Sequence, residues 1–89
     1  MRFEWDEPKR LRNLGRHGID FADCPAVFES QMLVTLDGRK DYGELRYIGI
    51  GILDGRIVTV VWTVRGETVR LISARKAHVK ERAAYRAGP

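Results

Sequence analysis

Residues 45–74, LRYIGIGILDGRIVTVVWTVRGETVRLISA, decide the fold. Val, Ile, Thr, Tyr and Trp, which favour strands, fill two long runs that meet at Asp54-Gly55. An Asp-Gly pair between two such runs is the strongest short-range signal for a β-hairpin with a two-residue loop. A second tight turn is predicted near Arg65-Gly66, and another strand-like run follows it. The stretch therefore predicts three consecutive antiparallel strands.

The hairpin loop determines which side chains share a face, because side chains alternate along a strand. The predicted pairs are Ile52–Ile57, Ile50–Thr59, Ile48–Val61, Tyr47–Trp62 and Arg46–Thr63, and a two-residue second turn would place Trp62 opposite Val69. One face is then apolar along its whole length and is expected to lie under helices. Its members are Leu45, Tyr47, Val58, Val60, Trp62, Val64, Val69 and Leu71.

The opposite face carries charge at one end, where Glu44, Arg46, Arg65 and Arg70 are predicted to gather. Strict alternation beyond Arg70 would keep Ala74 on that same face. Two interpretations remain open. The residues form either a solvated strand end with weak surface ion pairs, or a phosphate site, since arginine's planar fork matches phosphate oxygens and stays charged.

Helical signals precede and follow this stretch. Asp6 and Asp20 have the chemistry of N-caps, and the first helix is expected to end between Gly15 and Gly18. Pro25 predicts that the second helix is short or kinked. Its apolar face would be formed by Phe21, Cys24, Val27 and Phe28.

Two further strands are predicted, at residues 2–5 and 32–36, and the chain ends in a basic, alanine-containing helix. The predicted fold is α+β: one domain over residues 1–89, with two N-terminal helices, an antiparallel β-meander and a C-terminal basic helix.

Composition indicates a soluble globular domain with a basic surface. No apolar run approaches the ~20 residues that span a bilayer. The charged N-terminus is unlike a signal peptide, and the single Cys24 fits a reducing compartment, so a cytoplasmic location is expected. The net charge of +4, concentrated toward the C-terminus, favours nucleic acid or an acidic protein as partner. A solvated helix face would explain the same charges.

The sequence contains no zinc-ligand spacing, no glycine-rich phosphate loop and no nucleophile elbow, so no metal or cofactor is expected. Metal-free RNA cleavage needs a base for the 2′-hydroxyl, cations for the phosphoryl oxygens and an acid for the leaving oxygen. The arginines supply the cations, and Glu44 or His17 could serve as the base. His17 could instead interact with the helix dipole. His78 is expected to be an exposed residue and Tyr85 a packing residue.

The order of several short motifs resembles the BrnT family of toxins. The motifs are Phe3-Glu4-Trp5-Asp6, a basic helix with Asn13, Arg16-His17-Gly18, Tyr42-Gly43-Glu44, Thr63-x-Arg65-Gly66-Glu67 and the run Arg70 to Ala77, followed by Glu81-Arg82 and Tyr85. The resemblance covers almost the whole chain. It implies a RelE-like fold, a ribonuclease activity that blocks translation, and a BrnA-type antitoxin as partner, with operator DNA bound only through the complex.

The family's motif positions fall on His17, Glu44, Arg65, Arg70, Ser73, Arg75 and Tyr85. We expect catalysis from His17, Glu44, Arg46, Arg65 and Arg70, and binding of the RNA backbone by Arg75, Lys76, Lys80 and Arg82. The alternative is a non-catalytic module that only binds nucleic acid or the antitoxin. Tight binding of RNA that stays intact would favour that alternative.

Overall fold

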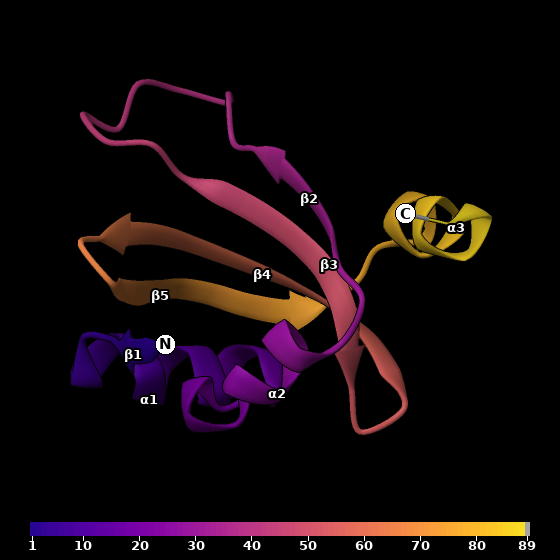
Figure 1. Cartoon of the computed structure of the whole chain (residues 1–89). Helices are drawn as coiled ribbons and strands as arrows, with labels where there is room; N and C mark the ends of the chain where they lie inside the picture. The colour runs from indigo at the N-terminus through magenta and orange to yellow at the C-terminus, as the bar shows by residue number, and fades with distance from the viewer. Residues whose placement is uncertain (89) are drawn as a thin grey trace.

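The computed structural model describes residues 1–88 and contains a five-stranded sheet flanked by helices (Figure 1). The elements are β1 (Arg2–Glu4), α1 (Glu7–His17), a 3-10 turn (Phe21–Asp23), α2 (Pro25–Glu29), β2 (Leu33–Leu36), β3 (Tyr47–Leu53), β4 (Arg56–Arg65), β5 (Thr68–Lys76) and α3 (Val79–Ala87). The predicted α+β class is confirmed. Among the described residues, the helices are too short or too polar to span a lipid bilayer.

The sheet is mixed, with strand order β1-β5-β4-β3-β2. The strands from β2 to β5 are antiparallel neighbours, whereas β1 pairs parallel with β5. The prediction of a purely antiparallel meander was therefore wrong at this edge. The N-terminal strand covers an edge of β5 that would otherwise expose unpaired backbone groups.

The β3–β4 hairpin has the predicted register, with four of the five predicted pairs confirmed. Arg46, predicted opposite Thr63, lies before the first residue of β3. Asp54 and Gly55 have φ angles of 50° and 75°. Both values lie in the left-handed region that a two-residue hairpin loop requires. The Asp-Gly pair thus correctly predicted the register of the two strands on either side of it.

The second turn lies one residue later than predicted, because Arg65 pairs with Thr68 and the loop is Gly66-Glu67. Trp62 is therefore opposite Leu71 rather than Val69. Moving the loop by one residue shifts the pairing by two. Arg70 consequently stays on the predicted face, opposite Thr63.

A β-bulge then interrupts the alternation of β5. The register shifts between Val61 and Trp62, so that Val61 pairs with Ser73 and Ile72 is the extra residue. Beyond the bulge, Ala74 lies in the core and Arg75 lies on the opposite face with Thr59. The expectation that Ala74 shares a face with Arg70 was wrong, because a bulge reverses the side on which later residues point.

The 3-10 turn and α2 cover one face of the sheet. Phe21, Cys24 and Val27 are fully buried there, against the core residues Val58, Val60, Trp62, Val69, Leu71 and Ala74. Pro25 begins α2 instead of lying inside a helix, so the predicted second helix is split into a 3-10 turn and a five-residue helix. The covered part of the face ends early, since Leu45 remains 66% exposed and Val64 49%. The predicted full cover of the apolar face was therefore wrong at this end.

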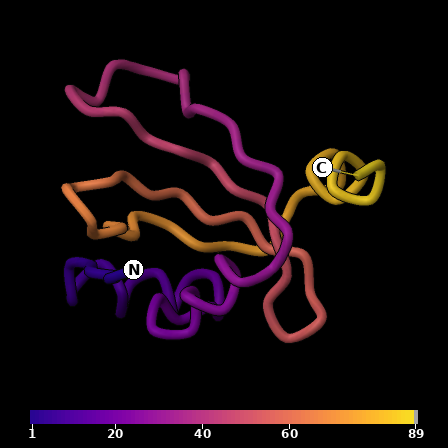
Figure 2. Tube along the Cα trace, viewed as in Figure 1, coloured from indigo at the N-terminus to yellow at the C-terminus, as the bar shows by residue number. Residues whose placement is uncertain are grey.

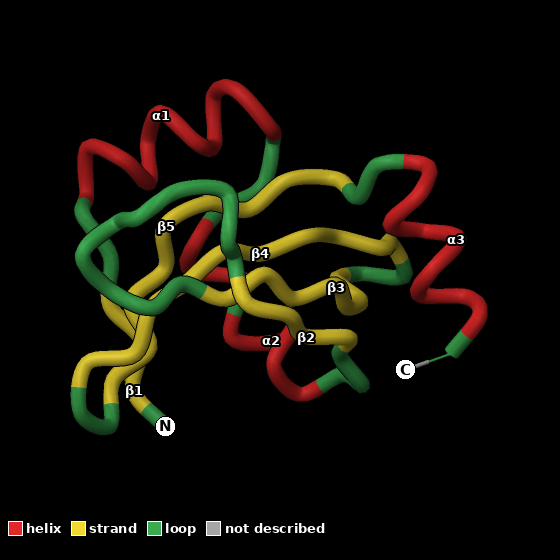
Figure 3. Tube along the Cα trace, turned by 90° about the horizontal axis from the view of Figure 1, so that it is seen from above, coloured by secondary structure: helices red, strands yellow, loops and turns green. Residues whose placement is uncertain are grey.

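Helix α1 runs beside β5 (Figure 3). It contacts the part of the β5 edge that the short strand β1 does not reach. The buried Asn13 side chain donates to the Ala74 carbonyl at 2.9 Å and accepts from the Ala74 amide at 3.2 Å. It also donates to the Ile19 carbonyl at 3.0 Å. Both predicted N-caps are present, since Asp6 accepts from the Lys9 amide and Asp20 from the Ala22 amide. Helix α1 ends at Gly18, which has a φ of 71°, within the predicted range. Asn13 thus ties the helix to the sheet as a neighbouring strand would.

Gly49 allows the side chains of Met32 and Trp62 to pack directly against the backbone of β3. A Cβ there would lie 2.4 Å from Met32 Cε and 2.6 Å from Trp62 Cζ3. This agrees with the close packing over Trp62 that the Gly-Ile-Gly pattern suggests. Trp62 in turn stacks on Tyr47 with a centroid distance of 5.8 Å.

Candidate functional site

The connection between β2 and β3, residues 37–46, lies at the same end of the sheet as the β4–β5 turn (Figure 2). Here Glu44 contacts two arginines, with Arg46 Nε at 3.1 Å and Arg65 Nη2 at 3.6 Å. The side chains of Glu44 and Arg46 are 28% and 24% exposed. A hollow of about 350 Å³ opens beside them, which we call the sheet-end hollow; it is lined by Glu44, Leu45, Tyr47, Thr63, Val64 and Arg65. Three of the four predicted cluster residues thus meet at one place.

Arg70 has a different partner. Its guanidinium donates to the Glu4 carboxylate on β1 at 2.5 Å, and the two residues are register partners across the β1–β5 pair. The side chain of Arg70 is 28% exposed. The parallel pairing of β1, absent from the predicted meander, supplies this carboxylate.

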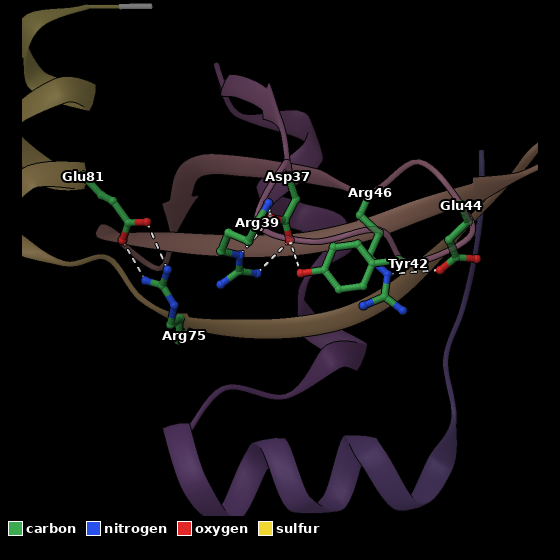
Figure 4. Close-up of polar contacts among 7 residues, drawn as sticks. All are labelled: Asp37, Arg39, Tyr42, Glu44, Arg46, Arg75 and Glu81. Carbon is green, nitrogen blue, oxygen red and sulfur yellow. Dashed lines mark hydrogen bonds and ion pairs between the residues drawn. The ribbon is translucent and has the colours of Figure 1, made fainter.

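The 37–46 connection is organised around a buried carboxylate that the sequence did not single out (Figure 4). Asp37 is fully buried in its side chain and accepts from Arg39 Nε at 2.8 Å and Arg39 Nη2 at 2.7 Å. The Tyr42 hydroxyl donates to the same carboxylate at 3.1 Å. These hydrogen bonds, of which those from the Arg39 side chain have the largest effect, hold the pKa of Asp37 well below its usual range. The Arg46 guanidinium lies over the Tyr42 ring at 4.0 Å, so Asp37 also fixes Arg46 through Tyr42.

Arg75 is held by Glu81, the third residue of α3 (Figure 4). The two guanidinium-to-carboxylate bonds measure 2.6 and 3.0 Å. Glu81 also accepts from the Thr59 hydroxyl at 3.1 Å and from the His78 amide at 2.7 Å. The Arg75 hydrogen bonds are the main cause that lowers the pKa of Glu81 to about 2. Arg75, predicted to bind RNA, is therefore paired with a carboxylate of the protein itself.

His17 lies away from Glu44, in a hollow of about 490 Å³ between α1 and β5 that we call the α1 groove. The groove is lined by Lys9, Arg12, Asn13, Arg16, His17, Ile72 and Ser73. Burial, with the neighbouring charges of Arg16 and Arg75, lowers the pKa of His17 below 6.5. Its imidazole is therefore neutral near pH 7 and can accept a proton.

The α1 groove and the sheet-end hollow are separate. Ser73 of the groove pairs with Val61, four residues along β4 from Arg65. At the usual rise of a strand, that is about 13 Å. His17 and Glu44, the two residues predicted as candidate bases, thus lie in different hollows.

The remaining predicted RNA contacts surround α3. Lys76 and Arg82 line a hollow of about 640 Å³, which we call the α3 hollow; its other lining residues are Ile52, Gly55, Arg56, Ile57, Ala77, Tyr85 and Arg86. Lys80 is exposed on α3. Tyr85 packs as expected: its hydroxyl donates to the Gln31 carbonyl at 2.6 Å and attaches α3 to the segment before β2. Within residues 1–88, no group of three or more His, Cys, Asp or Glu is placed to hold a metal ion.

The family model of the ribonuclease toxin BrnT, of type II toxin–antitoxin systems, matches residues 5–81. The chain belongs to the BrnT family. The BrnT match includes His17, Glu44, the α1 groove and the sheet-end hollow, and it ends at Glu81. Membership of a type II toxin–antitoxin family implies a ribonuclease toxin with a protein antitoxin as partner. No curated protein matches the chain.

Proposed function

We propose that this BrnT-family chain is an endoribonuclease that cleaves RNA without a metal ion and thereby inhibits translation. The carrying observation is the cluster beside the sheet-end hollow, in which the Glu44 carboxylate lies against the guanidinium groups of Arg46 and Arg65. A base and fixed cations side by side are the parts that attack by a 2′-hydroxyl requires.

In the proposed reaction, Glu44 takes the proton of a 2′-hydroxyl, and the oxygen attacks the adjacent phosphorus. Arg46 and Arg65, with Arg70 from the neighbouring strand, stabilise the charge on the phosphoryl oxygens. The bond to the 5′-oxygen breaks, and that oxygen takes up a proton from water. The products carry a 2′,3′-cyclic phosphate and a 5′-hydroxyl.

His17 is the second candidate for the base. Its lowered pKa keeps it neutral near pH 7, which a base requires. Because it lies in the α1 groove, it would act on a different phosphate position from Glu44. Replacing each residue separately decides between them.

We further propose that Lys76, Lys80 and Arg82 attract the RNA backbone, and that Arg75 joins them when Glu81 releases it. The partner would be a BrnA-like antitoxin whose acidic segment covers basic surface, with operator DNA bound only through the complex. Cation-mediated RNA binding should weaken steeply with salt. A RelE-like fold is part of the same proposal.

The test is induction of the chain alone and together with its candidate antitoxin, with cellular RNA examined for cleavage. Purified protein is assayed in parallel on RNA in the presence of a chelator. Growth arrest, cyclic-phosphate ends and cleavage that survives chelation are expected, with loss of cleavage in Glu44→Gln. RNA that binds to folded protein but stays intact would instead support the non-catalytic binding module.

A further inference from the structure

One arginine of α1 forms ion pairs within the protein, whereas three other basic residues of the helix do not. Arg10 pairs with Glu7 and, at 2.9 Å, with Asp20, which fixes the helix to the 3-10 turn. Lys9, Arg12 and Arg16 are exposed, and none of their side chains pairs with a carboxylate within residues 1–88. The fold therefore does not explain these three charges.

The three unpaired cations lie on one side of the helix, at spacings of three and four residues. All three line the α1 groove together with His17 and Ser73. From Lys9 to Arg16 the helix rises about 10 Å, so the groove offers positive charge along a length rather than at a point. A row of cations beside a hollow fits an extended polyanion better than a single small anion.

We propose that the α1 groove binds the phosphodiester backbone of the RNA and places a phosphate beside His17. This inference rests on the proposed function in one respect, namely that the ligand is RNA. It assigns Lys9, Arg12 and Arg16 to RNA binding, and none of them was among the predicted contacts.

The lining of the groove favours nucleic acid over a protein segment. Beside its cations it carries an amide, an imidazole and a hydroxyl, and its one aliphatic side chain is Ile72. The α3 hollow instead contains Ile52, Ile57 and the ring of Tyr85, which an apolar side chain of a protein partner could contact. A backbone phosphate needs cations and hydrogen-bond donors and gains little from an apolar floor.

The experiment measures binding of a 2′-O-methyl RNA oligonucleotide, which lacks the attacking hydroxyl and stays intact. The variants are Arg12→Gln, Arg16→Gln and the double variant, all at exposed positions. The control is Arg2→Gln, which removes the same charge from an exposed position on β1. Circular dichroism confirms that each variant is folded.

Each α1 variant should weaken binding several-fold at low salt, and the control should stay within about twofold of the wild type. Each lost phosphate contact should also reduce the slope of log affinity against log salt by about 0.7. Equal losses in the control and the α1 variants would overturn the proposal, because net charge alone would then explain them. Unchanged RNA affinity with lost antitoxin binding would overturn it as well and assign the groove to the protein partner.

The two proposals fail in different ways. If wild-type protein leaves natural RNA intact while the α1 variants still lose affinity for the 2′-O-methyl RNA, the cleavage proposal fails and the groove assignment stands. If natural RNA is cleaved and the α1 variants bind and cleave like the wild type, the groove assignment fails alone.

Discussion

Replacing Glu81 with Gln should release α3 from the sheet. The helix has no buried residue of its own, so it is attached mainly by polar contacts. Glu81 makes three of them, because it accepts two hydrogen bonds from Arg75 and one from Thr59 on the sheet. It also accepts from the amide of His78, the N-cap residue of the helix. A glutamine cannot accept a bidentate charged pair, and it leaves the Arg75 guanidinium without a counter-charge.

The size of the effect follows from the pKa of Glu81, which falls from 4.5 to about 2 in the folded protein. Each tenfold change in acidity corresponds to ~1.4 kcal/mol, so the ionised carboxylate contributes about 3 kcal/mol. Because the folded pKa is the lower one, this contribution is fully present above pH 4.5. It is lost as the pH falls from 4.5 toward 2.

The assay is urea denaturation between pH 7 and pH 2.5, combined with amide hydrogen exchange of α3. At pH 7, Glu81→Gln should lose about 2–3 kcal/mol of stability or, if α3 detaches by itself, show fast exchange confined to that helix. Its acid profile should be flatter than that of the wild type, and the two should converge near pH 2. Glu67→Gln is the control, since Glu67 is exposed in the β4–β5 turn. Wild-type stability and α3 protection in Glu81→Gln, or equal losses in both variants, would refute the reasoning.

Three further perturbations test other parts of the structure. Asp37→Asn should cost about 1–3 kcal/mol by urea denaturation and make the 37–46 connection sensitive to protease, because it removes a buried hydrogen-bonded carboxylate; unchanged proteolysis would contradict this. Gly49→Ala should destabilise the fold by about 1–3 kcal/mol through overpacking, whereas Gly38→Ala, whose Cβ would meet nothing within 4 Å, should be neutral. The imidazole of His17 should titrate below pH 6.5 by NMR, and Arg16→Gln should raise its pKa by removing a nearby charge; no change would exclude that charge as a cause.

Sequence reasoning was most accurate where the signal was local. Asp54-Gly55 admits one kind of loop, so the whole β3–β4 register followed from two residues. Asp6 and Gly18 bounded α1 for the same reason. The β4–β5 turn was harder to place, because either position of its two-residue loop leaves a glycine inside it.

The rest depends on contacts between distant segments. Nothing in the spacing of β5 shows that Ile72 is an extra residue, yet this bulge decides that Arg75 faces Thr59 and Glu81. The partner of Arg70 lies 66 residues away, on a strand whose pairing was not predicted. The contact of Glu44 with Arg46 and Arg65 was predicted because the three residues flank the open end of the β3–β4 hairpin, whose register follows from its loop.

In the proposed function, the arginines that are ion-paired within the protein and the cations that are unpaired have different roles. Arg46 and Arg65 share the Glu44 carboxylate, and Arg70 is bound to Glu4, so a phosphate at the sheet end must displace or share these partners. Such cations contribute little to ground-state binding, but they can stabilise the extra charge of a transition state.

The unpaired cations of the α1 groove have the opposite property, because in the proposed complex RNA would bind them without breaking an ion pair. Substituting Arg12 or Arg16 should therefore raise KM with little change in kcat, whereas Arg65→Gln should lower kcat at nearly constant KM. Steady-state cleavage of a short RNA at fixed salt measures both constants. If Arg65→Gln instead raised KM alone, the sheet-end arginines would be binding residues, and the chemistry would have to be sought beside His17.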